Sequence, residues 1–278
     1  MSVISSSGLR RASRQGMFVA GSIITLAVVL FALLGPFFAP YGENEIVGPP
    51  FSSNPGIFGT DYLGQDVLTR LMYGGTEILL IAVFGTALGM VLGVILGVVA
   101  AYAGGWWDEV LMRLNDVLLA FPQLLLVLVV LTAVDQVKGW MIVLLLGFSH
   151  TPRVARLARG VALGLVSRDF VIAAEALGEK RTRVIAAEVL PNMMPPLLAE
   201  AGLRLTFSIG LVGSLGFLGF ATDPDAANWG LMINENLLGM STQAWAVLAP
   251  VFIIAFFTIG TNLMADGIAR LTTQGGDR

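Results

Sequence analysis

Long apolar runs separated by short polar stretches dominate this chain. A bilayer core about 30 Å thick needs about 20 apolar residues per helix, and five of the runs reach that length. The sixth run, 140–148, is too short to cross alone. The runs fall at about residues 17–38, 78–103, 114–134, 140–148, 195–220 and 245–265.

The short run at 140–148 is followed by Arg153, Arg156 and Arg159, which recur every third residue with apolar residues between them. This spacing places the arginines on one stripe of a helix and the apolar residues on its other side. We therefore expect one helix that crosses the bilayer and continues past its inner surface. The pattern predicts an all-α polytopic membrane protein with six transmembrane helices.

The first run could instead be the core of a cleaved signal peptide, because Arg10, Arg11 and Arg14 precede it. Signal peptides have apolar regions of about 7–15 residues and a small-residue cleavage site. This run is longer, and no clear site of that kind ends it. We expect an uncleaved anchor helix, followed by a polar segment rich in Gly, Pro, Asn and Asp.

Composition supports membrane insertion. Apolar residues make up 56% of the 278 residues and charged residues only 13%, against about 25% charged in soluble domains. The mean hydropathy is +0.81 and the pI about 5.2, which excludes a disordered chain, an ordinary cytosolic enzyme and a basic nucleic-acid binder. The chain has no cysteine, so it forms no disulfide.

Positive charges give the orientation. With the N-terminus inside, the internal segments hold three, one, seven and two of the 16 lysines and arginines. Only Arg70 and Lys138 are external, and Arg204 falls within the fifth run. Because positively charged loops stay on the cytoplasmic side, both termini are expected in the cytosol.

No catalytic constellation is present in the sequence. There is no cysteine nucleophile, no G-x-S-x-G elbow and no HExxH motif, and His150 is the only histidine, so we expect no metal site. A phosphate-binding loop needs Gly-Lys followed by Ser or Thr, whereas Lys138 follows Val137 and Lys180 follows Glu179. If the chain supports active transport, an ion gradient or another chain supplies the energy.

Two features inside the apolar runs predict helix contacts. Glycines recur every fourth residue in the second run and form one helix face that a neighbouring backbone can approach. Glu200 and Arg204 stand four apart with the acid first, which favours an ion pair, although a role in gating or proton relay is the alternative. The glycines are Gly85, Gly89, Gly93 and Gly97.

The long internal segment after the fourth run has its own pattern. Residues 170–177 favour a helix, and Gly178 can end it in the left-handed conformation. A second helix should begin near Val184 and be interrupted by Pro191. We expect a short helix, a sharp bend and a second helix below the membrane, with a surface of Ala173, Ala174 and Ala176.

This segment resembles the EAA loop of permease subunits in binding-protein-dependent ABC importers. In that pattern Glu-Ala-Ala is followed by three residues, Gly, and Leu-Pro twelve residues beyond the Gly. The alanines are Ala173 and Ala174, the glycine is Gly178, and Leu190-Pro191 ends the pattern. Ile172 stands where the family usually has Glu, and Glu175 does not reproduce its position.

Four further segments are similar to the dipeptide/oligopeptide/nickel subfamily, in the member with an extra N-terminal span. Gly59-Thr-Asp-Tyr-Leu-Gly-Gln-Asp66 with Arg70 resembles a GTD-x-LGRD-xxSR signature. The other segments are Gly104-Gly-Trp-Trp-Asp108 through Ala120-Phe-Pro122, Gly216-Phe-Leu-Gly219 with Trp229–Glu235, and Asn262-Leu-Met-Ala-Asp-Gly267.

The resemblance implies the type I ABC importer transmembrane fold. Residues 1–73 would form an anchor helix and outer segment, 74–267 the transmembrane domain with a cytosolic coupling loop at 168–191, and 268–278 a cytosolic tail. The partners implied are the lipid bilayer, a second permease, two cytosolic ATPase subunits that hold ATP and magnesium, and an external binding protein. The coupling-loop residues implied are Ile172, Ala173, Ala174, Glu175, Gly178, Leu190 and Pro191.

Di- or oligopeptides are the favoured cargo because the chain offers no metal ligands, with nickel or another small solute as the alternative. A secondary transporter would need unpaired intramembrane acids or broken helices, and only Glu200 and Arg204 are available. A membrane-embedded enzyme and a non-transporting scaffold are the remaining alternatives.

Overall fold

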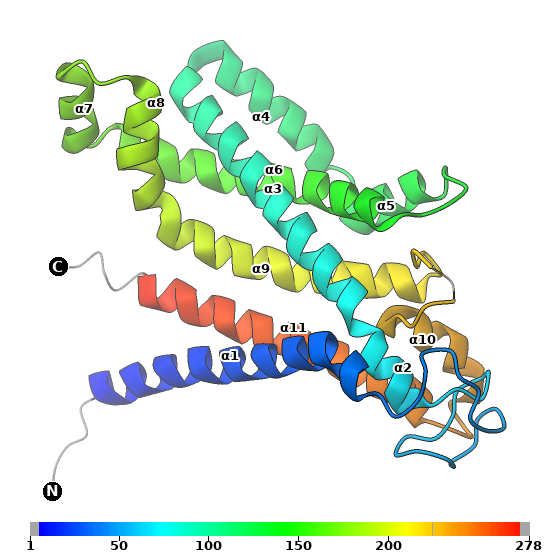
Figure 1. The fold of residues 1–278 in the computed structure, drawn as a ribbon. Coiled ribbons are helices and arrows are strands. Elements are labelled where there is room, and N and C mark those ends of the chain that lie inside the picture. The colour runs from blue at the N-terminus through cyan, green and yellow to red at the C-terminus, as the bar shows by residue number, and fades with distance from the viewer. Residues whose placement is uncertain (1–5, 224, 273–278) are drawn as a thin grey trace, which may run out of the picture.

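The computed structural model describes residues 6–223 and 225–272, and this part of the chain is helical, with two isolated β-bridges and no β-strand (Figure 1). Among the described residues, five helices exceed 25 residues and are joined by shorter ones. The elements are α1 (Ser6–Phe38), α2 (Val67–Tyr73), α3 (Gly75–Ala103), α4 (Gly105–Leu119), α5 (Gln123–Leu131), α6 (Gly139–Val166), α7 (Asp169–Ala176), α8 (Arg181–Val184), the π-helical turn Ile185–Val189, α9 (Leu190–Phe217), α10 (Trp229–Asn236), the 3₁₀ turn Leu237–Gly239 and α11 (Trp245–Thr272).

The long helices pack in pairs. Helix α3 lies along α6, α1 along α11, and α9 lies between α11 and α3. In Figure 1, α7, the start of α1 and the end of α11 point toward one end of the bundle, while α2 and α10 lie at the opposite end. The bundle therefore presents two different ends, one with α7 and one with the segment that precedes α2.

Helices long and apolar enough to cross a membrane cover most of the predicted spans. Four qualify in the described part of the chain, and a bent helix pair makes a fifth. The four are Gly16–Phe38, Val67–Ala103, Arg181–Phe217 and Trp245–Arg270. Six spans, which include α6, remain a prediction. Of the predicted tail at 268–278, residues 268–272 continue α11, and 273–278 lie outside the described residues.

The third predicted span, 114–134, was wrong as a continuous helix. It is divided between α4 and α5, whose axes differ by 78°. Pro122 lies at the break and precedes the first residue of α5. Proline lacks an N–H donor and disfavours the helical conformation in the residue before it, so the helix ends and restarts with a new direction.

Helix α6 is one continuous helix, as predicted, and its arginines are interspersed with residues that pack on α3. A Cβ placed on Gly93 of α3 would meet Val154 of α6 at 2.5 Å. Gly93 lies about 15 Å from the end of α3 at 1.5 Å per residue. Arg153 and Arg156 flank this contact, and both side chains are exposed. Arg156 pairs with Asp116 of α4, and Arg153 donates to Gln123 of α5.

The glycines of α3 form a face on which α6 packs. A Cβ on Gly89 would stand 2.7 Å from the Cβ of His150, and one on Gly97 would stand 2.8 Å from the Cβ of Ala158. No ordinary side chain fits such gaps. The four-residue spacing keeps these close approaches on one side of α3 over four helical turns.

A buried ion cluster holds the outer segment against α2 and α10. The guanidinium of Arg70 lies 2.8 Å from the carboxylate of Asp61 and 3.0 Å from that of Glu235. Asp66 caps α2 by accepting from the N–H of Thr69. The GTD-like segment is thus a folded connector, and its charged residues are used in holding it to the bundle.

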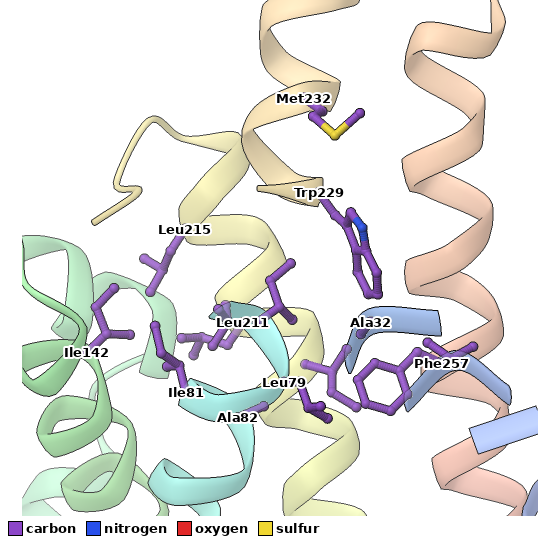
Figure 2. Packing of buried hydrophobic residues seen from close by; sticks show 14 of the residues in the cluster. Ala32, Leu79, Ile81, Ala82, Ile142, Leu211, Leu215, Trp229, Met232 and Phe257 are labelled. Carbon is purple, nitrogen blue, oxygen red and sulfur yellow. The ribbon is translucent and has the colours of Figure 1, made fainter. Parts of the chain in front are cut away.

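The main apolar cluster joins this end of the bundle to the spans. Trp229 is fully buried, and its indole N–H donates to the Leu71 carbonyl at 2.7 Å. Figure 2 shows the ring reaching from α10 toward Ala32 of α1 and Phe257 of α11. One side chain therefore closes the junction of α10 and α11 with α1, which is far from them in sequence.

We predict that Gly93→Leu destabilises the protein by about 1–3 kcal/mol, the usual cost of overpacking a close contact. The measurement is the melting temperature of the purified protein in detergent. Val91→Leu is the matched control, because Val91 lies on the same helix and is 57% exposed. Equal melting temperatures for the two variants would show that the glycine face is not a packing surface.

Candidate functional site

The segment between α6 and α9 folds into a short helix, a tight bend and a second helix. Gly178 has φ +86°, so it ends α7 in the left-handed conformation that the sequence predicted. The N–H of Glu179 donates to the Ala174 carbonyl at 3.2 Å, and the N–H of Gly178 donates to that of Glu175 at 3.0 Å. These two bonds form a Schellman motif, which uses the last carbonyls of α7 and sets the direction of the chain.

The prediction that Pro191 interrupts the second helix was wrong. Pro191 lies in the first turn of α9, directly after the π-helical turn Ile185–Val189, and the helix continues to Phe217. A π turn bonds each N–H one residue further back, which widens the helix. Pro191 removes one hydrogen bond from this continuous helix, and the wider π turn before it accommodates the proline ring. The chain therefore runs without a break from α8 into the span.

Helix α7 has an inner and an outer side. Val171 is fully buried, and Ala174 packs beside it. On the outer side, Phe170, Ala173 and Leu177 are spaced as one helical stripe, and Phe170 and Leu177 are 40% and 86% exposed. We call these three residues the docking stripe. Ile172 is also exposed, at 55%.

An apolar cluster connects α7 with the spans. Val171 of α7 and Val184 of α8 pack with side chains of α3, α6 and α9. We call this group the inner apolar cluster. Its buried members are Val98, Ala101, Ala158, Ala162, Val171, Val184, Val189, Met193 and Leu197. A force on α7 would reach three spans through direct side-chain contact.

The arginine stripe of α6 faces α4 and α5. Arg159 lies 2.5 Å from Asp108, and Arg156 lies 2.6 Å from Asp116. Arg153 donates to the side-chain oxygen of Gln123 at 3.1 Å. The aspartates belong to the motif that starts at Gly104, so its acidic positions serve to hold the broken span onto α6.

The predicted pair on α9 is present as a close contact. The Nε atom of Arg204 lies 2.8 Å from a carboxylate oxygen of Glu200, with the two side chains 10% and 14% exposed. The contact is an ion pair by distance, but the N–H is not aligned for a hydrogen bond. The guanidinium also lies 5.0 Å from the ring centre of Phe207.

His150 takes part in a buried polar network that sequence reasoning did not predict. Its Nε2 lies 2.8 Å from the hydroxyl of Ser208, which lies 2.7 Å from that of Thr86. The network joins α6, α9 and α3. The partners are 58 and 122 residues apart in sequence, so no local spacing could reveal them.

In the described part of the chain, no group of three or more His, Cys, Asp or Glu side chains could hold a metal ion.

Two family profiles together match most of the chain. Residues 67–274 match the "Binding-protein-dependent transport system inner membrane component". Residues 6–55 match the "N-terminal TM domain of oligopeptide transport permease C".

Curated relatives match along nearly the whole chain. The dipeptide transport system permease protein of Alkalihalophilus pseudofirmus is 30% identical over 93% of this chain and 86% of its own length. The corresponding protein of Bacillus subtilis is 32% identical over 93% of this chain and 82% of its own. The glutathione transport system permease protein of Escherichia coli O157:H7 is 31% identical, over 93% and 86%.

A solved structure shares the fold. The methionine ABC transporter in an inward-facing conformation contains a chain that aligns with a TM-score of 0.55 at 15% identity. The alignment covers 72% of this chain and 96% of that one. At this identity the similarity establishes the transmembrane fold alone.

We predict that Glu200→Gln lowers stability more than the double variant Glu200→Gln/Arg204→Gln. Removing one partner leaves a nearly buried charge without compensation, at about 3–5 kcal/mol, whereas removing both leaves none. The readouts are the yield of folded protein and its melting temperature in detergent. Losses that simply add in the double variant would show that the two side chains do not interact.

Proposed function

Because the chain belongs to the family of binding-protein-dependent transport system inner membrane components, we propose that it is the permease subunit of an ATP-driven peptide importer. It forms half of the translocation pathway and converts closure of the ATPase subunits into alternating access. The observation that carries this proposal is the docking stripe on α7, backed by the inner apolar cluster that reaches three spans.

The proposed importer is an assembly of four kinds of protein subunit. This chain pairs with a second, homologous permease, two cytosolic ATPase subunits dock on the permeases, and a binding protein delivers the substrate from outside. ATP is hydrolysed on the ATPase subunits, since the sequence has no phosphate-binding loop. This chain is the mechanical component and has no catalytic role of its own.

Peptides are the proposed cargo. The relatives named above are permeases for dipeptides and glutathione, which is itself a small peptide. Nickel and other small solutes remain the second candidate, which the metal-ligand content does not favour. Residues 168–191 are the proposed coupling loop, and its proposed contact residues are Ile172, Ala173, Ala174, Glu175, Gly178, Leu190 and Pro191, with Ala174 backing the contact from the inner side.

The proposed mechanism follows from the packing of α7. ATP binding closes the two ATPase subunits, and the α7 helices of the two permeases move with them. The inner apolar cluster passes this movement to α3, α6 and α9. A switch of this kind requires that ATP and substrate each bind the two conformations unequally.

The protein is a multi-pass inner-membrane protein, and we propose that both termini and α7 are cytosolic while the segment before α2 is external. The charge distribution supports this orientation. The start of α1, the end of α11 and α7 also lie at one end of the bundle (Figure 1). The N-terminal anchor and outer segment would be residues 1–73, and the transmembrane domain 74–267.

Single cysteines in this cysteine-free chain test the orientation. We predict that Ile57→Cys is labelled by a membrane-impermeant thiol reagent on intact cells, since Ile57 is 78% exposed. Arg168→Cys should be labelled only after permeabilisation, which also serves as the control for its reactivity. Labelling of residue 168 from outside intact cells would reverse the proposed orientation.

We predict that Gly178→Glu abolishes uptake while the protein still inserts into the membrane. The left-handed backbone adds about 1–2 kcal/mol of strain, and the new side chain would stand at the end of the docking stripe. Gly219→Glu is the matched control. Both glycines have φ +86° and open space where a Cβ would be. Gly219, however, follows the C-terminal end of α9, whereas Gly178 lies before the start of that helix.

The measurement is uptake of a labelled peptide together with co-purification of the ATPase subunits, at equal expression of each variant. Gly178→Glu should lose both, and Gly219→Glu should keep the co-purification. Wild-type uptake by Gly178→Glu would remove this loop from the coupling path.

A further inference from the structure

A group of ionisable side chains gathers on one side of the bundle, away from the coupling loop. They come from α4, α6 and α9 and are Asp116, Arg153, Arg156, Glu200 and Arg204. We call them the charged face. A cavity of about 410 Å³ lies here, lined by Leu119, Arg153, Arg156, Leu157 and Glu200. The charged face therefore surrounds a space that can hold a small ligand group.

The charges of this face do not balance. Arg156 pairs with Asp116 at 2.6 Å, and Arg204 pairs with Glu200 at 2.8 Å. Arg153 contacts only the neutral amide of Gln123, at 3.1 Å. Among the described residues, no carboxylate forms an ion pair with Arg153. One positive charge is left uncompensated at the cavity.

The position of Arg153 excludes contact with lipid. Its neighbour Val154 packs on Gly93 of α3, and the Arg153 side chain is exposed. An exposed guanidinium beside this helix contact faces water, an ion partner or another protein chain, because its exposure to lipid would cost several kcal/mol. The charged face is thus turned toward an aqueous space or another subunit.

A second surface of the bundle has the character of a lipid-facing one. A groove of about 710 Å³ runs between α3, α9 and α11. It is lined almost wholly by apolar side chains such as Met90, Leu198 and Met264. The same transmembrane domain therefore has one apolar side and one charged side, and only the charged side is suited to the passage of a polar substrate.

We propose that Arg153 is a carboxylate-binding residue on the wall of the translocation pathway, where its guanidinium pairs with the carboxylate of a passing peptide. The proposal rests on the proposed function, peptide import. Every unmodified peptide carries a C-terminal carboxylate. A guanidinium presents several N–H donors in a fork that matches a carboxylate, and Gln123 accepts from only one of them.

The surroundings of Arg153 suit transient binding. Its guanidinium is held by one neutral partner. The acid that lines the same cavity, Glu200, is paired with Arg204. Arg156 and Arg204 are each already paired, so they make no comparable free site. A single uncompensated charge beside a hydrated cavity attracts the carboxylate but leaves it free to move on.

A cysteine beside Arg153 tests directly the electrostatic potential that the Arg153 charge creates in the cavity. Leu157→Cys places a thiol one helical turn away, on the lining of the same cavity. In the assembled importer, we measure how fast it reacts with an anionic and with a cationic methanethiosulfonate reagent. Arg153→Gln should lower the ratio of the anionic to the cationic rate about fivefold, the effect of one charge at about 8 Å in a hydrated site.

Two variants serve as controls for that ratio. Arg153→Lys should keep it close to the starting value, because the charge remains. Arg113→Gln should leave it unchanged, since Arg113 is exposed, pairs with Glu109 and lies outside the cavity lining. A thiol at 157 that reacts with neither reagent would overturn the proposal, because the cavity would then face lipid or a tightly packed subunit.

A second measurement identifies the ligand. Dialanine should slow the reaction of the anionic reagent at residue 157, dialanine amide should not, and Arg153→Gln should abolish the difference. Equal protection by both peptides, or protection that survives Arg153→Gln, would overturn carboxylate binding at Arg153. A partner-subunit carboxylate paired with Arg153 would give no charge-dependent rate ratio and would also overturn it.

The two proposals fail differently. If the wild-type importer takes up no peptide while the reagent ratio still depends on Arg153, the proposed cargo is wrong and the anion site remains. If peptide uptake is normal and the ratio is the same with Gln at position 153, the cargo stands and the carboxylate site is excluded.

Discussion

The close approach of α3 to α6 is the contact on which the other features depend. Apolar side chains gain little by leaving lipid for another helix, so two spans associate through tight van der Waals packing and polar contacts. The glycine face of α3 allows α6 to lie almost backbone to backbone. This fixes the rotation of α6, which in turn directs its arginine stripe toward α4 and α5 and its inner end toward α7.

That rotation separates two chemical environments on one helix. On one side, Val154 and Ala158 of α6 pack against glycine. On the other, Arg156 and Arg159 hold the broken span through Asp116 and Asp108. The break at Pro122 is what lets α4 follow the arginine stripe while α5 takes another direction. Arg153, which pairs with no carboxylate among the described residues, then stands at the cavity lined by α4, α6 and α9.

Local patterns in the sequence predicted most of the helices and the coupling loop. Contacts between residues far apart in sequence could not be predicted in this way. The apolar runs gave the long helices, Gly178 gave the end of α7, and a motif with fixed spacing identified the coupling loop. The acidic partners of the α6 arginines could not be predicted from local spacing, because Asp116 and Asp108 lie 40 and 51 residues away in sequence. The sequence analysis expected a docking surface of alanines and did not include Phe170 and Leu177. Their i, i+3, i+7 spacing with Ala173 is the signal that could have predicted this stripe. The network of His150 with Ser208 and Thr86 depends on tertiary packing that no local spacing encodes.

The central claim is that α7 and the inner halves of α3, α6 and α9 move as one body, because the inner apolar cluster connects them. The most direct test is the distance between spin labels at Asp169→Cys on α7 and Val99→Cys on α3, in the complete importer with and without trapped ATP. Both side chains are exposed, and the chain has no other cysteine. The account predicts a change of no more than about 2 Å, the scale of small shifts between packed helices. A change of about 5 Å or more, a full helical turn, would show that α7 slides over the spans and does not carry them with it.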